Sequence, residues 1–154
     1  MAAGIADDLD IDPSSVRANV FGIGDDGRLH IVPGLTWNMA PGKELSVAMS
    51  AGSGSTGRCF ATGVPNIAMR RATGAGWGAD ILPTSEMEKL HRDLSWIVSI
   101  PIVIGHSDAR PVWILNADGL VPVEQSRLNA IAPSLLYWAE ALSLILRTNL
   151  EDQQ

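Results

Sequence analysis

Two apolar runs in the second half of the chain most constrain its fold. They span residues 96–104 and 112–117, and a short polar segment of hairpin length, residues 105–110, connects them. Apolar runs of this kind, without regular polar alternation, are typical of strands that are covered on both faces. The sequence therefore predicts a sheet that lies between two layers, rather than a meander with one wet face.

Further strands are expected before these runs. Asp25-Asp26-Gly27 separates a strand predicted over residues 16–24 from another over residues 28–37, and Gly and Asp tolerate the positive φ of a hairpin turn. The other predicted elements are an extended segment over 44–49, a short helix over 55–62, a strand over 66–71, an irregular segment over 72–83 and a helix over 84–94 capped by Thr84 or Ser85.

The last predicted element is a long helix over residues 123–147. Its apolar residues recur at steps of three or four, and they are Leu128, Ile131, Leu135, Trp138, Leu142 and Ile145. Leu136, Leu144 and Leu146 widen this apolar arc beyond what one sheet face needs, which predicts a homodimer through residues 135–146. Pro133 lies inside the helix and is expected to kink it.

Composition narrows the class of protein. A chain of 154 residues predicts one domain with a real core, here residues 16–148 between an acidic linker or tail (1–15) and a polar tail (149–154). The net charge of −6 argues against a nucleic-acid partner, and the single Cys59 excludes an internal disulfide. Residues 1–20 lack a secretory pattern and the apolar runs are short of a membrane span, so we expect a cytoplasmic protein with no membrane contact.

Three motifs, in order and spacing, resemble the GAF family. They are Gly54-Ser-Thr-Gly-Arg-Cys-Phe-Ala-Thr-Gly-Val-Pro65, Ser99-Ile-Pro-Ile102 and Pro111-Val-Trp-Ile-Leu-Asn-Ala-Asp-Gly119. The resemblance covers residues 16–148 and fits better than the PAS family, the nearest alternative. It implies an α+β fold with a single antiparallel sheet. The long C-terminal helix would lie on one face, with short helices and loops over a ligand pocket on the other.

No motif for catalysis or for a cofactor is complete. Residues 52–57 match G-x-G-x-x-G, but no βαβ unit surrounds them, and His91-Arg92-Asp93 lacks the other parts of a kinase site. The GAF branch that reduces methionine sulfoxide uses several cysteines, the bilin branch usually has His after its cysteine, and the cyclic-nucleotide signature is absent. The resemblance therefore implies a non-enzymatic sensory or regulatory domain of a larger signalling protein, and the sequence identifies no cofactor. A ligandless dimerisation module and a single-cysteine redox enzyme remain as alternatives.

The resemblance also implies where a small molecule would bind. The pocket is expected between the sheet and residues 54–63 and 69–81, with Arg70 or Arg71 as a cation for an anionic ligand. Trp77 is expected either to cover this pocket as a lid or only to fill the core. Trp113 stands where the family usually has glycine, and either packs under the terminal helix or enters the pocket. The predicted ligand-binding residues are Cys59, Phe60, Arg70, Arg71, Trp77, Trp96, Ser99 and Trp113.

Overall fold

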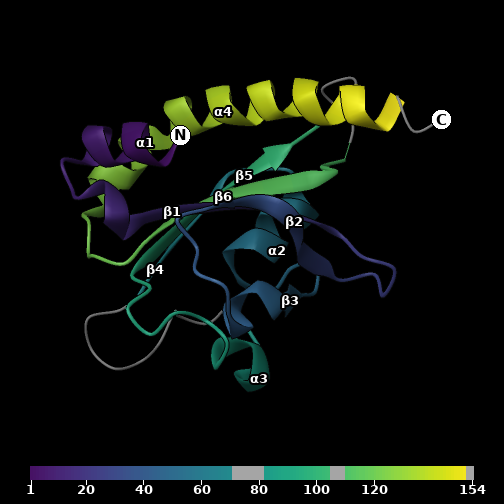
Figure 1. Ribbon diagram of the computed structural model, residues 1–154, viewed down its shortest axis with the longest axis horizontal. Helices are drawn as coiled ribbons and strands as arrows, with labels where there is room; N and C mark the ends of the chain where they lie inside the picture. The colour runs from purple at the N-terminus through teal and green to yellow at the C-terminus, as the bar shows by residue number, and fades with distance from the viewer. Residues whose placement is uncertain (71–81, 105–109, 152–154) are drawn as a thin grey trace.

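The computed structural model describes residues 1–70, 82–104 and 110–151 and has a single sheet between two layers (Figure 1). The strands are β1 (Val16–Ile23), β2 (Leu29–Trp37), β3 (Ala48–Met49), β4 (Asn66–Met69), β5 (Trp96–Ile102) and β6 (Trp113–Gly119). The helices are α1 (Ala2–Leu9), α2 (Gly54–Thr62), α3 (Thr84–Met87) and α4 (Gln125–Glu151), and two 3-10 segments are η1 (Pro13–Ser15) and η2 (Lys43–Ser46).

All neighbouring strands in the sheet are antiparallel, in the order β3-β2-β1-β6-β5-β4. The predicted hairpin at Asp25-Asp26-Gly27 joins β1 to β2, and Gly27 has a φ of 73°. The two apolar runs form β5 and β6, which are neighbours and largely buried on both faces. The predicted α+β fold with one antiparallel sheet is confirmed.

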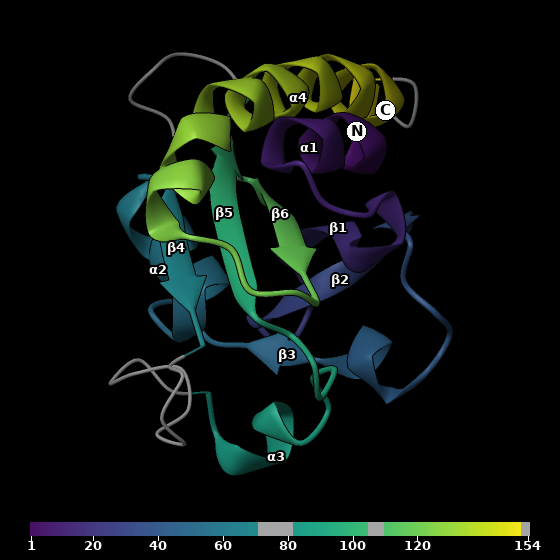
Figure 2. The same cartoon turned by 90° about the vertical axis from the view of Figure 1, so that its left-hand side faces the viewer.

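Helices α1 and α4 cover one face of the sheet, which we call the α4 face (Figure 2). Leu128, Ile131 and Leu135 of α4 are almost completely buried there. They pack with alternate residues of the strands, because successive side chains of a strand point to opposite faces. The strand residues of this core are Val16, Val20, Trp96, Val98, Ile100, Ile102, Leu115 and Ala117.

Helix α1 lies in the segment that the sequence suggested was a linker or tail, and there the prediction was wrong. Ile5, Ala6 and Leu9 are buried against the core, with Ala2 one turn earlier. These small and apolar residues follow helical spacing, while Asp7, Asp8 and Asp10 make the segment look like an acidic tail. The predicted domain limits at residues 16 and 148 stay predictions.

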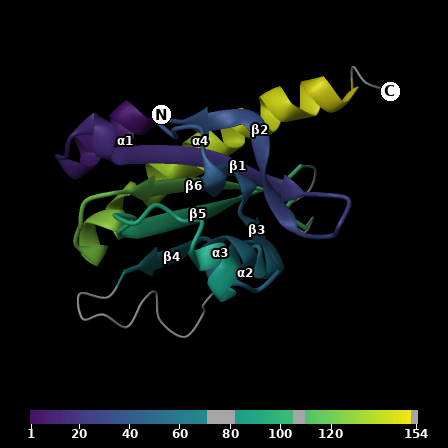
Figure 3. The same ribbon diagram turned by 60° about the horizontal axis from the view of Figure 1, so that its bottom comes forward.

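The opposite face carries α2, α3 and η2, and we call it the α2 face (Figure 3). A second apolar cluster lies between α2 and the β1–β2–β6 part of the sheet. Its buried members are Phe21, Leu29, Ile31, Val47, Met49, Cys59, Leu82 and Ile114. Both faces of the central strands are therefore covered, as the apolar runs predicted.

Two elements on the α2 face differ from the sequence prediction. The helix expected over residues 84–94 is only Thr84–Met87. In a longer helix the His91 N–H would bond to the Met87 carbonyl, but it donates instead to Glu44 at 3.0 Å. The segment 44–49 is extended only from Val47 onward, because Lys43–Ser46 forms a 3-10 turn in which the Ser46 hydroxyl donates to the Lys43 carbonyl.

Helix α4 continues through Pro133 as a single helix. By length and composition alone its segment Gln125–Arg147 could cross a bilayer, although the core helix of a soluble protein passes the same test. One side of α4 packs on the sheet, as described above. The other side leaves large apolar residues exposed, among them Leu136, Tyr137, Trp138 and Ile145.

Candidate functional site

Four polar side chains form a buried row across the centre of the α2 face. Arg17 and Asn19 come from β1, and Asn116 and Asp118 come from β6. Each is only 3–4% exposed. They alternate along their strands with residues of the α4-face core, so the pleat points all four to the same side. We call these four residues the polar row.

Arg17 carries the strongest interactions of the row. Its Nε donates to Asp118 Oδ1 at 2.6 Å, while Nη1 and Nη2 donate to the two carboxylate oxygens of Glu44 at 2.7 and 3.0 Å. Burial alone would lower the pKa of Arg17, but the charges of Asp118 and Glu44 outweigh it and raise that pKa. The guanidinium is therefore charged, and one cation faces two carboxylates in the interior.

The carboxylate of Asp118 fixes the orientation of both asparagine amides. Ionised Asp118 can only accept hydrogen bonds, so the Asn19 Nδ2 donates to its Oδ2 at 3.2 Å. This leaves Asn19 Oδ1 as an acceptor, and Asn116 Nδ2 donates to it at 3.2 Å and to the Thr56 hydroxyl at 2.9 Å. Turning the Asn116 amide over would place two oxygens against each other.

This series of hydrogen bonds ends at an acceptor, the side-chain oxygen of Asn116, to which no described residue donates. Asn116 Oδ1 is shielded from solvent and accepts no hydrogen bond from any residue that the structure describes. A buried acceptor left in this state costs about 1–3 kcal/mol. Such an atom in a native protein calls for an explanation, and a bound water or ligand that donates to it is one.

A small cavity lies against the polar row. Its volume is about 20 Å³, enough for about one water molecule. The wall opposite the sheet is made by side chains from loops and short segments, chiefly Met39, Glu44, Leu90 and Leu94. A ligand larger than water would have to move these side chains, which belong to no long helix or central strand.

Two hydroxyl contacts fix the start of α2 beside the row. The buried Ser99 of β5 donates to the Ser55 hydroxyl at 2.9 Å, and Ser55 donates to the Asn66 carbonyl of β4 at 3.1 Å. Thr56, also buried, accepts from Asn116. The predicted short helix over residues 55–62 thus reaches the sheet through its first-turn hydroxyls, and Ser99 lies on the predicted face.

The structure separates the tryptophans predicted in the site from the α2 face. Trp96 is completely buried on the α4 face, where its indole N–H donates to the Val121 carbonyl at 3.0 Å. Trp113 is half-buried and packs against the same core, so it lies under α4 rather than in the cavity. Ser99 and Trp96 are three residues apart in one strand and therefore point to opposite faces.

The remaining predicted residues are also spread out. Arg70 is exposed, and its side chain donates to the Arg92 carbonyl. Phe60 packs at the edge of the apolar cluster that contains Cys59. Arg71 and Trp77 lie outside the described residues. The set is therefore not brought together as one site, and its ligand-binding role stays a prediction.

Cys59 is placed for packing rather than for thiol chemistry. The side chain is completely buried among apolar residues of the α2 face. Burial raises the pKa of the thiol to about 12. Because the thiolate is the reactive form, Cys59 is almost entirely in its inert form at neutral pH.

Sequence reasoning missed the polar row, although a signal for it was present. Arg17 and Asn19 are two residues apart in β1, and Asn116 and Asp118 are two apart in an otherwise apolar β6. Polar residues at period two in strands covered on both faces must be buried, and buried polar groups require partners. That reasoning would have identified the row, though not Glu44 as its partner.

Comparison with known proteins addresses the fold. No family model matches the chain, and no curated protein matches it significantly. Among solved structures, the GAF domain of A. aeolicus NLH2 in an inactive state is 14% identical with a TM-score of 0.57, over 96% of this chain and 94% of that one. This chain has a GAF-like fold.

Two further solved structures resemble this chain and come from proteins of different kinds. A domain assigned to a two-component sensor histidine kinase from Sinorhizobium meliloti 1021 is 14% identical with a TM-score of 0.57, over 99% of this chain and 92% of that one. The free methionine-R-sulfoxide reductase from Neisseria meningitidis, in complex with its substrate, is 15% identical with a TM-score of 0.58, over 92% and 75%. At such identities the likeness shows the fold alone, because one fold hosts many functions.

Proposed function

We propose that this chain is a non-enzymatic sensory domain of a larger signalling protein, which binds a small molecule against the polar row. The observation that carries the proposal is Asn116 Oδ1, a buried acceptor to which no described residue donates, on a side chain that helps to line a cavity. A ligand with an ammonium, amide or hydroxyl group would donate to this oxygen. The cluster of Arg17, Asp118 and Glu44 has two carboxylates and one cation. Its net negative charge favours a ligand group that donates hydrogen bonds over one that accepts them.

The fold offers a route from this site to both terminal helices. The polar row lies on β1 and β6, and the opposite face of the same two strands packs against α1 and α4. Figure 2 shows these two helices side by side on that face. A ligand that shifts β1 against β6 would therefore change the packing under α1 and α4, and through them any flanking segments of a larger protein.

The state of Cys59 supports the non-enzymatic proposal. A redox enzyme with one cysteine needs an accessible thiol with a base nearby. Cys59 is instead completely buried in an apolar cluster, with its pKa raised to about 12. The methionine sulfoxide reductase among the neighbours is therefore no argument for that activity here.

A thermal-shift screen of small polar metabolites tests the binding proposal. We expect at least one compound with a donor group to raise the melting temperature, because binding to the folded state alone stabilises it. Asn116→Leu removes the acceptor and is expected to abolish the shift. The matched control is Asn129→Leu, the same change at an exposed position of α4. A shift that persists in the Asn116 variant would contradict the assignment of this site.

We also propose that the domain forms a homodimer through the outer side of α4. Tyr137 is 67% exposed and Ile145 is 58% exposed, and Tyr137 makes an edge-to-face contact with Trp138 at 5.9 Å between ring centres. Large apolar residues gathered on one exposed helix side mark an interface. A second copy of the chain presents the same surface, so two copies can pair about a twofold axis. Twofold dimers are the commonest symmetric assemblies among soluble oligomers.

Sedimentation equilibrium tests the dimer. We expect the wild-type chain to be a dimer at micromolar concentration. The double variant Tyr137→Glu, Ile145→Glu is expected to be a monomer, because burying each new carboxylate in the interface would remove its hydration at a large cost in free energy. Val64→Glu is the control, because Val64 is 58% exposed at the turn between α2 and β4. If the wild-type chain stays monomeric at high concentration, the dimer proposal fails. If it dimerises but binds no compound, the alternative of a ligandless dimerisation module stands instead.

A further inference from the structure

Glu44 occupies a site on Arg17 that is built like a binding site for an oxyanion. Nη1 and Nη2 of Arg17 donate to its two carboxylate oxygens, and the His91 N–H donates to Oε1 at 3.0 Å. Paired donation from one guanidinium is the geometry with which arginine recognises free carboxylate and phosphate groups. Glu44 fills this position from within the chain.

Arg17 does not need Glu44 to balance its charge. Asp118 accepts from Arg17 Nε at 2.6 Å and supplies one negative charge, which leaves Glu44 as a second carboxylate on a single cation. Glu44 is also the outermost member of the cluster. Its side chain is 16% exposed, against 4% for Arg17 and 6% for Asp118. Glu44 can therefore leave while Arg17 and Asp118 remain a neutral pair.

The segment that carries Glu44 is short and joins no long element. Glu44 belongs to η2, which follows Gly42 and precedes the two-residue strand β3. Besides the bonds to Glu44, Lys89 Nζ donates to the Ser46 carbonyl at 3.1 Å, so an outward movement of η2 would break this hydrogen bond as well. The chain is anchored directly after η2, because Val47 is 1% exposed in the apolar cluster of the α2 face and the Ala48 N–H donates to Glu86 at 2.9 Å.

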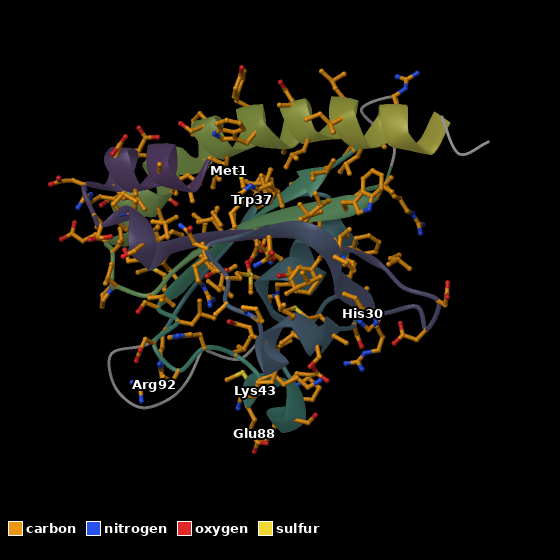
Figure 4. All side chains as sticks on the ribbon, viewed as in Figure 1. Met1, His30, Trp37, Lys43, Glu88 and Arg92 are labelled. Atoms are coloured by element: carbon orange, nitrogen blue, oxygen red, sulfur yellow. The ribbon has the colours of Figure 1, made fainter. Side chains whose placement is uncertain are left out.

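A cationic groove opens onto the same ion pair from outside. Its volume is about 440 Å³, and Arg17 and Glu44 form part of its wall. Its other charged residues are Lys43, Lys89 and Arg92, so four cationic side chains and one carboxylate line the groove in a protein with a net charge of −6. Lys89 is bonded to Glu86 at 2.9 Å, and Arg92 lies 3.5 Å from Asp93. Figure 4 shows Lys43 and Arg92 on the side of the molecule away from α4.

We infer that the groove, which adjoins the cavity through Arg17 and Glu44, is itself a binding site in which a small carboxylate or phosphate compound exchanges with Glu44 on Arg17. The incoming oxyanion accepts the two Arg17 bonds and the His91 N–H bond that Glu44 gives up, and the lysines and Arg92 attract it to the groove. Glu44 moves outward into solvent, and η2 moves with it. The exchange needs no ligand in the cavity beside Asn116, so it does not rest on the function proposed above.

The experiment titrates formate, acetate and inorganic phosphate into ¹⁵N-labelled protein, with chloride as the ionic-strength control. In the wild type we expect weak, saturable shifts of the His91 amide and Arg17 Nε–H signals, because Glu44 competes with the anion. Glu44→Ala removes the competitor, and we expect binding to be about tenfold tighter or more. If only the carboxylates bind, or only phosphate binds, the result identifies the oxyanion that the groove prefers.

Matched variants separate this exchange from a general charge effect. Glu88→Ala removes the same charge from an exposed position outside the groove and is expected to leave the affinity unchanged. Lys43→Gln is expected to weaken binding in the wild type and in Glu44→Ala alike. Glu44→Gln keeps the size of the side chain and, should Glu44→Ala fold poorly, is expected to show the same direction of change. Equal affinity in wild type, Glu44→Gln and Glu88→Ala, or shifts that spare His91 and Arg17, would overturn the inference.

Discussion

Replacing Arg17 by methionine is expected to cost about 3–5 kcal/mol of the free energy of unfolding near neutral pH, because it leaves buried carboxylates without a cation. Asp118 is 4% exposed, and Arg17 bonds to both Asp118 and Glu44. Without Arg17 the negative charge of Glu44 would act on Asp118 with no cation between them. Urea denaturation measures the loss. Arg92→Met is the control, since that side chain is 91% exposed, and it is expected to change stability by less than about 0.5 kcal/mol.

The loss in Arg17→Met should also depend on pH. Burial raises the pKa of Asp118 in the wild type, although Arg17 opposes this, and removing Arg17 raises it further. A group with a raised folded-state pKa favours folding below its unfolded pKa of about 3.9, and this contribution is lost as the pH rises through the folded-state pKa. We therefore expect a larger loss at about pH 8 than at about pH 5. Adding Asp118→Asn should restore part of the stability, and a loss independent of pH would contradict the account.

The second large effect is expected at Trp96. The side chain is completely buried on the α4 face, and its ring lies over Gly119, where an added Cβ would come within 2.2 Å of ring atom Cε2. Trp96→Ala is expected to cost about 3–5 kcal/mol, as for other large-to-small changes in a core. Gly119→Ala is also expected to destabilise the protein, because the indole must move.

A double-mutant cycle between these positions checks the packing. In the Trp96→Ala background, Gly119→Ala should change the free energy of unfolding little, because the added methyl group then occupies space that the indole ring no longer fills. The expected result in urea denaturation is therefore a strong positive coupling between the two changes. Additive losses would show that Trp96 does not pack on Gly119 as described.

Much of the fold follows from local patterns in the sequence. The turn residues Asp25-Asp26-Gly27 predicted the β1–β2 hairpin, and the apolar runs predicted β5 and β6 as covered strands. The spacing of Leu128, Ile131 and Leu135 predicted α4 and its buried side. In each case the local preference of the residues agrees with the final fold, so neighbouring sequence is sufficient.

Other elements depend on contacts between distant residues. The helix predicted over 84–94 ends at Met87, and beyond it the His91 N–H donates to Glu44, which is 47 residues away in the sequence. The acidic residues of α1 obscure the apolar side of this helix in the sequence, and α4 packs against α1 in the fold. No local pattern contains this information.

The candidate site was the least predictable part. The residues predicted to bind ligand included Trp96 and Ser99, but the period of a strand sends them to opposite faces. The polar row could have been identified from Arg17, Asn19, Asn116 and Asp118 at period two. The partner Glu44 and the missing donor at Asn116 Oδ1 could not, because both depend on how η2 and α2 pack over the sheet.

The most direct test of the central claim, that the polar row binds a small molecule, is to follow its side-chain amides by NMR. A compound found in the thermal-shift screen would be titrated into ¹⁵N-labelled protein while the Asn19 and Asn116 side-chain signals are recorded. We expect saturable shifts of both, larger than those of the Trp96 indole N–H on the α4 face. Binding that shifts the Trp96 signal and leaves both asparagine amides unchanged would contradict this claim.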